Sequence, residues 1–445
     1  MTANGVLLES GVSPMGAEVP TVCSGPLCGH RRKGSPMTTL LTGATVWDGL
    51  DDRPAGVRDI LIENGRIFKI AEKIAAPAGA VVIDLTGHTV TPGFMDCHTH
   101  VTVTPAIFPV LTRSAVATAL ATIPVLKTML LNGFTTIRDL MTADTGYNTL
   151  DLRDAITAGL IEGPRMLVAP HLISARGAHG DFSGALDDQY QGRPRPMELA
   201  AADGCDEIRS RVRTEIRAGA DWIKFGATGG FSTPSDDPAQ TTYSQEEMDA
   251  LVATARDLGR HATPHCYGDE GVRRAVHAGV RSIEHGNLAT ADTLQIMIDN
   301  GVYLVPTQFT TLDDARHVDD DAFWAGQPAF KRRKYKIHQK ALLDGADHVA
   351  NSDVKIAFGT DAGMFPHAEN WKEFPTMVST GITPARALKA ATSVAAELLE
   401  LDDLGVLAPG KTADIIAMPG DPFTDIDVTG QADFVMKEGV VHKRP

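Results

Sequence analysis

The hydrophobic pattern of the chain begins with short alternating runs. Between Leu40 and Leu85 apolar and polar residues alternate, with no segment of helical period. Four of these runs predict strands: Leu41–Trp47, Arg58–Glu63, Arg66–Ile70 and Ala80–Leu85. Because alternation turns one side of each strand inward, we expect a small β-module here.

A different pattern follows Pro92. Helical stretches such as Glu246–Gly259 and Asp269–Ala278 end at a glycine, and a short apolar run follows each. Glycine accepts the left-handed conformation that ends a helix, so each glycine predicts a helix-to-strand junction. The predicted strands lie near residues 93–98, 135–140, 165–170, 222–227, 261–266, 282–286, 303–307 and 356–361. Strands alternating with helices in this number predict an α/β fold, the (β/α)8 TIM barrel, with a doubly wound sheet as the alternative.

The end of the chain returns to the strand pattern. Gly405–Ala417 is interpreted as strand, turn and strand, and Ala432–Lys443 as a hairpin. We therefore expect residues 37–92 and 400–445 to form one small β-sandwich domain from both chain ends, beside a barrel of residues 93–399. Residues 1–36 are rich in Gly, Pro and Ser and are expected to be a flexible extension. They contain no signal-peptide core, which favours a cytoplasmic location.

Composition narrows the class of function. Of 445 residues, 43% are hydrophobic and 22% charged, as in ordinary globular proteins. The 41 Lys and Arg residues against 56 Asp and Glu give a net charge of −15, which argues against nucleic-acid binding. No apolar run approaches the ~18 residues of a membrane span. A small-molecule substrate is therefore the expected partner.

Metal-binding side chains recur where the predicted barrel strands end. They are His98 and His100 after the first strand, Lys224 on the fourth, His265 and His285 ending the fifth and sixth, and Asp361 ending the eighth. Carboxyl ends of barrel strands share one face, so these side chains should converge. The i, i+2 spacing of His98 and His100 puts both imidazoles on one side of a strand, and neutral imidazoles suit zinc. A pair of this kind alone is as readily structural, but histidines on neighbouring strands favour a metal site.

Asp361 and Lys224 carry the predicted chemistry. Asp361 could accept a proton from a metal-bound water, whose pKa the metal lowers to about 7, or could simply cap a helix. Lys224 lies among apolar neighbours on a strand that should be interior, where a protonated amine is disfavoured. As a neutral amine it could add carbon dioxide and become a carbamate that bridges two metals. The alternative is a lysine that extends its charged end to solvent.

Taken together, these motifs resemble the amidohydrolase superfamily in its binuclear form with a carboxylated lysine. The matching segments are residues 92–100, 283–287, 359–363 and 410–414. They are similar to those of the imidazolonepropionase-related group, which includes Xaa-Pro dipeptidases, carboxypeptidases and ochratoxin-degrading hydrolases. The resemblance covers about residues 38–445.

The resemblance implies two divalent metal ions, with zinc favoured by ligand type and manganese or cobalt able to replace it. One ion would be held by His98, His100 and Asp361, the other by His265 and His285, with the Lys224 carbamate between them. A metal-bridging hydroxide would then attack an amide carbonyl. The implied function is cleavage of the amide C–N bond of a dipeptide or N-acyl amino acid, ochratoxin-type amides included, by a homo-oligomer.

Three long connections at the same face are expected to shape the pocket. They are His171–Gly204, Thr228–Tyr243 and Phe309–Lys336. His179 is predicted to contact the scissile carbonyl or its oxyanion, and Tyr243 a substrate carboxylate, with loop packing as the alternative for both. Arg138 and Asp139, at the end of the second strand, are equally explained as an internal ion pair that supports the site.

Two other functions remain open from the sequence. A mononuclear deaminase or cyclic-amide hydrolase, imidazolonepropionase-like, would use the same fold, but such enzymes generally lack the lysine of strand four. A non-catalytic scaffold would keep the barrel without its chemistry. The presence of all six predicted ligands argues against that scaffold.

Overall fold

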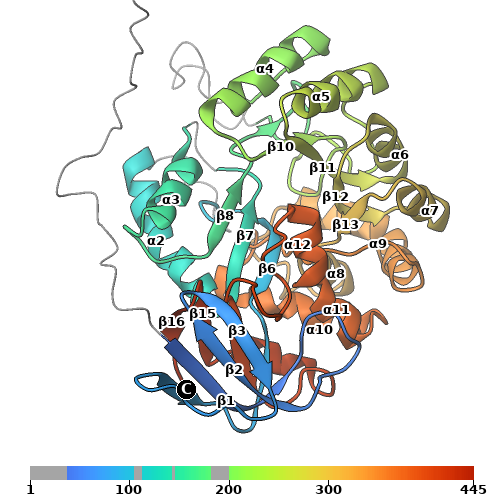
Figure 1. The fold of residues 1–445 in the computed structure, drawn as a ribbon. Helices are drawn as coiled ribbons and strands as arrows, with labels where there is room; N and C mark the ends of the chain where they lie inside the picture. Colours follow the sequence, from blue (N-terminus) through green and yellow to red (C-terminus); the bar gives the residue numbers. More distant parts are fainter. Residues whose placement is uncertain (1–37, 105–112, 143–145, 182–199) are drawn as a thin grey trace, which may run out of the picture.

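The computed structural model of the chain describes residues 38–104, 113–142, 146–181 and 200–445. The expected flexible extension, residues 1–36, lies outside the described residues, as does much of the predicted loop His171–Gly204. Figure 1 shows two parts: strands surrounded by helices, and a sheet beside them that contains the first and last strands. No helix in the described ranges is both long and apolar enough to cross a membrane.

The sheet is built from both ends of the chain. Its early strands are β1 (Thr38–Val46), β2 (Val57–Glu63), β3 (Arg66–Ala71), β4 (Val81–Asp84) and β5 (His88–Pro92), and its late strands are β14 (Ile415–Pro419), β15 (Phe434–Lys437) and β16 (Val440–Lys443). The strand order is β16-β15-β14-β5-β1-β2-β3, with β4 paired to β1. Antiparallel pairing of β14 with β5 places Ala417 opposite Val90 and joins the two ends. A shared apolar core that includes Ile60, Ile415 and Phe434 packs on this sheet.

One detail of the predicted β-module is wrong. Gly405–Ala417 contributes only the start of β14, not two strands. The stretch before it contacts the start of β3 instead: Gly410 donates its backbone N–H to the carbonyl oxygen of Ile67, and Thr412 forms an isolated bridge with Arg66. These contacts do not form a continuous ladder. The predicted domain boundaries themselves remain a prediction.

The barrel strands are parallel and occur in two sheets. The first contains β6 (Phe94–Thr99), β7 (Phe134–Asp139) and β8 (Arg165–Val168), and the second contains β9 (Leu172–Ile173), β10 (Trp222–Gly226), β11 (His261–Gly268), β12 (Ser282–Leu288) and β13 (Tyr303–Val305). The eighth predicted strand, residues 356–361, is an irregular segment with isolated bridges at its ends. Its backbone still bonds Leu304 of β13 on one side and Cys97 of β6 on the other. The architecture is the α/β (β/α)8 fold predicted from the sequence.

Helices alternate with these strands. Between β6 and β13 the helices are α2 (Ala115–Leu131), α3 (Asn148–Thr157), α4 (Gly204–Ala218), α5 (Gln245–Asp257), α6 (Asp269–Ala278) and α7 (Ala291–Asp299). After β13 come α8 (Gln308–Arg316), α9 (Ala329–Ala350), α10 (Glu373–Ser379), α11 (Pro384–Ala390) and α12 (Ser393–Leu399), with the 3-10 helices η4 (His367–Lys372) and η5 (Ile426–Gln431). Gly219 and Gly279 end α4 and α6 in the left-handed conformation, which confirms the predicted junctions.

The predicted loop Phe309–Lys336 is largely helical. It contains most of α8 and the first turns of α9. Its aromatic residues explain the difference, because Trp324 is buried with Tyr335 and Leu342 against α8 and α9 rather than extending into a pocket.

Candidate metal centre

Three of the predicted ligands meet directly. A ligand atom from each of His98, His100 and Asp361 lies within 4.8 Å of the other two, and all three residues are buried. His100 Nε2 is 3.1 Å and His98 Nε2 3.5 Å from Asp361 Oδ1. The i, i+2 spacing at the end of β6 therefore turns both imidazoles towards the same carboxylate. A metal ion can be held by such a group.

The remaining histidines continue from this group as a row of ring contacts. The ring of His98 lies 4.9 Å from that of His285, which lies 4.6 Å from that of His265. His179 stacks on His265 at 4.1 Å with an interplanar angle of 15°. The carboxyl ends of β6, β11 and β12 thus bring together the histidines that the sequence places far apart.

Hydrogen bonds hold one nitrogen of each ring. His98 Nδ1 is 2.8 Å from Glu284 Oε2, and His285 Nδ1 is 2.8 Å from Thr307 Oγ1. His265 Nε2 is 3.2 Å from the carbonyl oxygen of Gly229. Where the held nitrogen carries the proton, the opposite nitrogen presents a lone pair, which is the form that binds metal.

Burial keeps these histidines neutral. It lowers the pKa of His285 to about 3 and places the pKa values of His98 and His265 well below the ordinary range. Neutral imidazoles at ordinary pH are the state that a divalent cation requires.

Lys224 lies in β10, is 2% exposed and is near enough to His98, His265 and His285 to act on their charge. Its Nζ has no hydrogen-bond partner among the described residues. Burial lowers the pKa of Lys224 to about 8, and its charge in turn disfavours protonation of His98, His265 and His285. An ammonium with no acceptor costs several kcal/mol to bury. The surroundings therefore make the neutral, reactive amine more accessible than in a solvent-exposed lysine.

A buried ion pair beneath the histidines is the main feature that the sequence did not predict. Arg138 Nη2 donates to Glu284 Oε1 at 2.7 Å, and both side chains are fully buried. Ser282 and Thr263 donate hydroxyl hydrogen bonds to the same oxygen. Oε1 of Glu284 is thus held by three donors, while its other oxygen lies against His98 Nδ1.

The predicted ion pair of Arg138 with Asp139 is thus wrong, because Arg138 pairs with Glu284 instead. Successive residues on a strand point to opposite sides, so these two side chains diverge, and Asp139 accepts the backbone N–H of Val101. The spacing on β12 could have indicated the true partner of Arg138. Ser282 and Glu284 are two residues apart, so they share one side of the strand, and Arg138 donates to both.

Three residues at the centre have left-handed backbones. The φ angles are 72° for His285, 63° for Asp361 and 45° for Thr307, the residue bonded to His285. Such conformations cost on the order of 1–3 kcal/mol each in residues with a Cβ, and they cluster at functional sites. Two predicted ligands are therefore aimed by backbone geometry that packing must maintain.

The structure places the two predicted substrate contacts differently. His179 stacks against His265 at the centre, with its side chain 16% exposed. Tyr243 is 1% exposed within the main apolar core, and its hydroxyl donates to the carbonyl oxygen of Ala202 at 2.8 Å. The substrate contact of Tyr243 stays a prediction, and the bond to Ala202 gives this tyrosine a packing role.

Replacement of Tyr243 by phenylalanine separates these roles. Loss of the hydrogen bond to Ala202 should lower the free energy of unfolding by about 1 kcal/mol, because a buried carbonyl loses its partner. On the packing role, kcat/KM is expected to stay unchanged. A fall in kcat/KM at wild-type stability would instead support the substrate contact.

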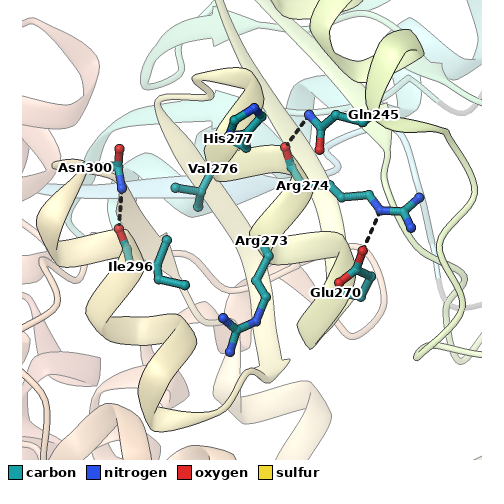
Figure 2. Close-up of a pocket in the computed structure, with 8 residues that line it drawn as sticks. All are labelled: Gln245, Glu270, Arg273, Arg274, Val276, His277, Ile296 and Asn300. Carbon is teal, nitrogen blue, oxygen red and sulfur yellow. Dashed lines mark hydrogen bonds and ion pairs between the residues drawn. The ribbon is translucent and has the colours of Figure 1, made fainter.

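A surface pocket lies away from this centre. Figure 2 shows it between α5, α6 and α7, with Arg273, Arg274 and His277 on its walls. Its volume is about 350 Å³. Arg273 is paired with Asp269, and Arg274 with Glu270. None of the predicted site residues lines this pocket.

Comparison with known proteins identifies the class. Residues 89–441 match the model of the amidohydrolase family. The ochratoxinase of Aspergillus niger is 31% identical over 335 residues, covering 71% of this chain and 66% of that relative. The chain thus spans slightly less than two thirds of the length of this curated relative.

Solved structures of similar proteins match a larger share of the chain. A Xaa-Pro dipeptidase with bound methionine in its active site is 34% identical with a TM-score of 0.84, covering 91% of this chain and all of that one. A prolidase complexed with N-methylphosphonate-L-proline is 33% identical with a TM-score of 0.81, covering 92% and 100%. The fold is the α/β barrel that these structures share. The chain belongs to the amidohydrolase family.

The residues present fit the metal centre that this family generally uses. The carboxylate of Asp361 and neutral histidines are suitable donors, and His98, His285 and His265 each have one ring nitrogen held by a hydrogen bond. The unpartnered, buried Nζ of Lys224 also fits, because an amine there lacks the acceptor that a structural lysine would need. The centre therefore has the donor set for divalent cations.

Proposed function

We propose that this protein is a metal-dependent amidohydrolase that cleaves the amide C–N bond of a dipeptide or N-acyl amino acid carrying a free carboxylate. The observation that carries the proposal is the unpartnered Lys224 amine buried beside the neutral histidines. The Xaa-Pro dipeptidase and prolidase relatives support a substrate of this class. Their identity, near one third, leaves the amine side of the substrate to experiment.

Each side chain has a role in this proposal. His98, His100 and Asp361 would hold one divalent ion, and His265 and His285 a second, with carboxylated Lys224 between them. When bound, the ions supply an activated water and polarise the amide carbonyl. Zinc is the metal favoured by these ligands.

Asp361 would act as the proton carrier. Burial alone would raise the pKa of Asp361, but the hydrogen bond from His100 and the neighbouring histidines outweigh it and hold that pKa below the usual range. The ionised carboxylate can accept a proton and deliver it to the leaving nitrogen.

His179 would contact the substrate carbonyl. Its ring lies on His265 and therefore at the edge of the centre. A donor in this position would stabilise negative charge that develops on the carbonyl oxygen. We also propose that the active protein is a homo-oligomer.

The test is an activity screen of metal-loaded protein. Xaa-Pro dipeptides and N-acyl amino acids should be hydrolysed, and each is compared with its C-terminal amide, which lacks the free carboxylate. We expect at least a tenfold higher kcat/KM for the acids, roughly 1.4 kcal/mol of recognition. A chelator should inactivate the protein, and added zinc, manganese or cobalt should restore it.

The results separate the functions considered from the sequence. Free amino acid as product supports amide cleavage. Release of ammonia from a cyclic or amino-substituted ring would favour the deaminase instead. A protein that binds metal and hydrolyses none of these amides would contradict the proposal.

A further inference from the structure

The segment that follows β10, residues 227–242, holds two of the imidazoles at the centre. The carbonyl oxygen of Gly229 lies 3.2 Å from His265 Nε2, and Thr233 Oγ1 lies 2.8 Å from His179 Nδ1. A Cβ added to Gly230 would lie 2.5 Å from the His179 ring, so the backbone of this segment packs directly on that ring. The position of the His179 ring therefore depends on where this segment lies, whereas His265 is also fixed by its own strand, β11.

Lys334 of α9 fixes the position of this segment. Its Nζ donates to the carbonyl oxygens of Gly230 at 2.7 Å and Thr233 at 2.5 Å, and to Asp236 Oδ1 at 2.8 Å. An ammonium has three donors, and all three are used on this one segment. The side chains of Lys334 and Asp236 are each 6% exposed.

Asp236 connects this ammonium to the centre. Its Oδ2 lies 3.6 Å from His179 Nδ1, while its Oδ1 also accepts the backbone N–H of Gly230. Burial would raise the pKa of Asp236, but the bonds and charges of His179 and Lys334 lower it. A charged lysine, a charged aspartate and His179 thus form a continuous chain of contacts.

The contacts of α9 with the segment extend beyond Lys334. The ring of Tyr335 stacks on that of Phe231 at 4.1 Å, and His338 Nε2 lies 3.0 Å from Asp237 Oδ2. Residues 334, 335 and 338 share a helical face. Helix α9 therefore contacts residues 227–242 through three side chains on one face.

We propose that Lys334 is a positioning residue for the reaction: through Gly230, Thr233 and Asp236 it holds the segment after β10 so that His179 stays against the metal centre. This inference rests on the proposed function for its kinetic consequence. In the part of the chain that the structure describes, Lys334 Nζ bonds Gly230, Thr233 and Asp236, none of which is a predicted metal ligand. Its effect is transmitted through His179.

The kinetic test replaces Lys334 with methionine, which keeps the length of the side chain and removes its charge. We expect kcat to fall about 10–100-fold with a much smaller change in KM, because a displaced His179 loses its contact in the transition state. Bound metal should stay at the wild-type level. Lys336→Met is the matched control, since Lys336 is on the same helix, half exposed and paired only with Asp319.

A double-mutant cycle shows whether the effect passes through His179. The variant Lys334→Met/His179→Ala should have the kcat of His179→Ala alone. Additive losses would overturn the proposal, as would wild-type kcat in Lys334→Met. If Lys334→Met does not fold, Lys334→Met/Asp236→Asn replaces it in the cycle, because that pair leaves no unpaired buried charge.

A measurement without substrate keeps this inference separate from the proposed function. Backbone hydrogen exchange of residues 229–237 should be faster in Lys334→Met than in the wild type, and unchanged in Lys336→Met. Unchanged exchange in both variants would overturn the role of Lys334. If the wild type hydrolyses no amide but exchange is still faster in Lys334→Met, the positioning contact is sustained and only the proposed function is removed.

Discussion

Replacing Lys224 with alanine is expected to abolish amide hydrolysis and to lower bound metal from about two ions per chain towards one or none. The reason is the position of the Nζ atom, which is buried without a hydrogen-bond partner among the described residues. Its charge interacts electrostatically with His98, His265 and His285. A carbamate on this nitrogen would supply the negative charge that two neighbouring cations need. Alanine can supply none.

Metal content by elemental analysis and kcat by product release measure this effect. Lys355→Ala, at an exposed lysine paired with Glu397, is the matched control and should keep both values. A melting curve verifies that the Lys224 variant folds. Full metal together with wild-type kcat in Lys224→Ala would refute the bridging role.

Replacing Arg138 with methionine should destabilise the fold by about 3–5 kcal/mol, the cost of leaving one partner of a buried ion pair alone. Glu284 has no water to replace the guanidinium, because both side chains are fully buried. Arg138 also donates to the Cys97 carbonyl and lies 4.4 Å over the Trp222 ring, so its loss disturbs β6 and β10 together. Urea unfolding measures the change.

The control for this prediction removes the charge of the partner as well. Arg138→Met/Glu284→Gln should recover part of the lost stability, since no unpaired carboxylate remains buried. It should not recover metal affinity, because a glutamine holds the Nδ1 proton of His98 less strongly than a carboxylate does. An Arg138→Met protein as stable as the wild type would contradict the stabilising role of this buried pair.

The sequence predicted those features that depend on periodicity. Spacing of two on β6 placed His98 and His100 on one side, and glycines such as Gly279 marked where helices end. Strand ends in a barrel face the same way, so His265 and His285 could be grouped without knowing any distance. The alternation rule was sufficient for these positions.

Partners brought together across the barrel could not be predicted in this way. Arg138 and Glu284 are separated by 146 positions, and their pairing depends on how the strands tilt and pack. Lys334 and Asp236 meet because a helix crosses over a distant connection. The φ angle of Asp361 is likewise set by the surrounding packing and not by the local sequence.

The pairing of β14 with β5 has a consequence for synthesis on the ribosome. When β5 emerges, its partner lies beyond the whole barrel, so one edge of the nascent sheet stays open while the intervening residues are translated. Open edges invite pairing with other polypeptides. A transcript cut short before residue 415 would yield a chain whose barrel is fully encoded but whose β5 edge never closes, and such fragments should be prone to aggregate.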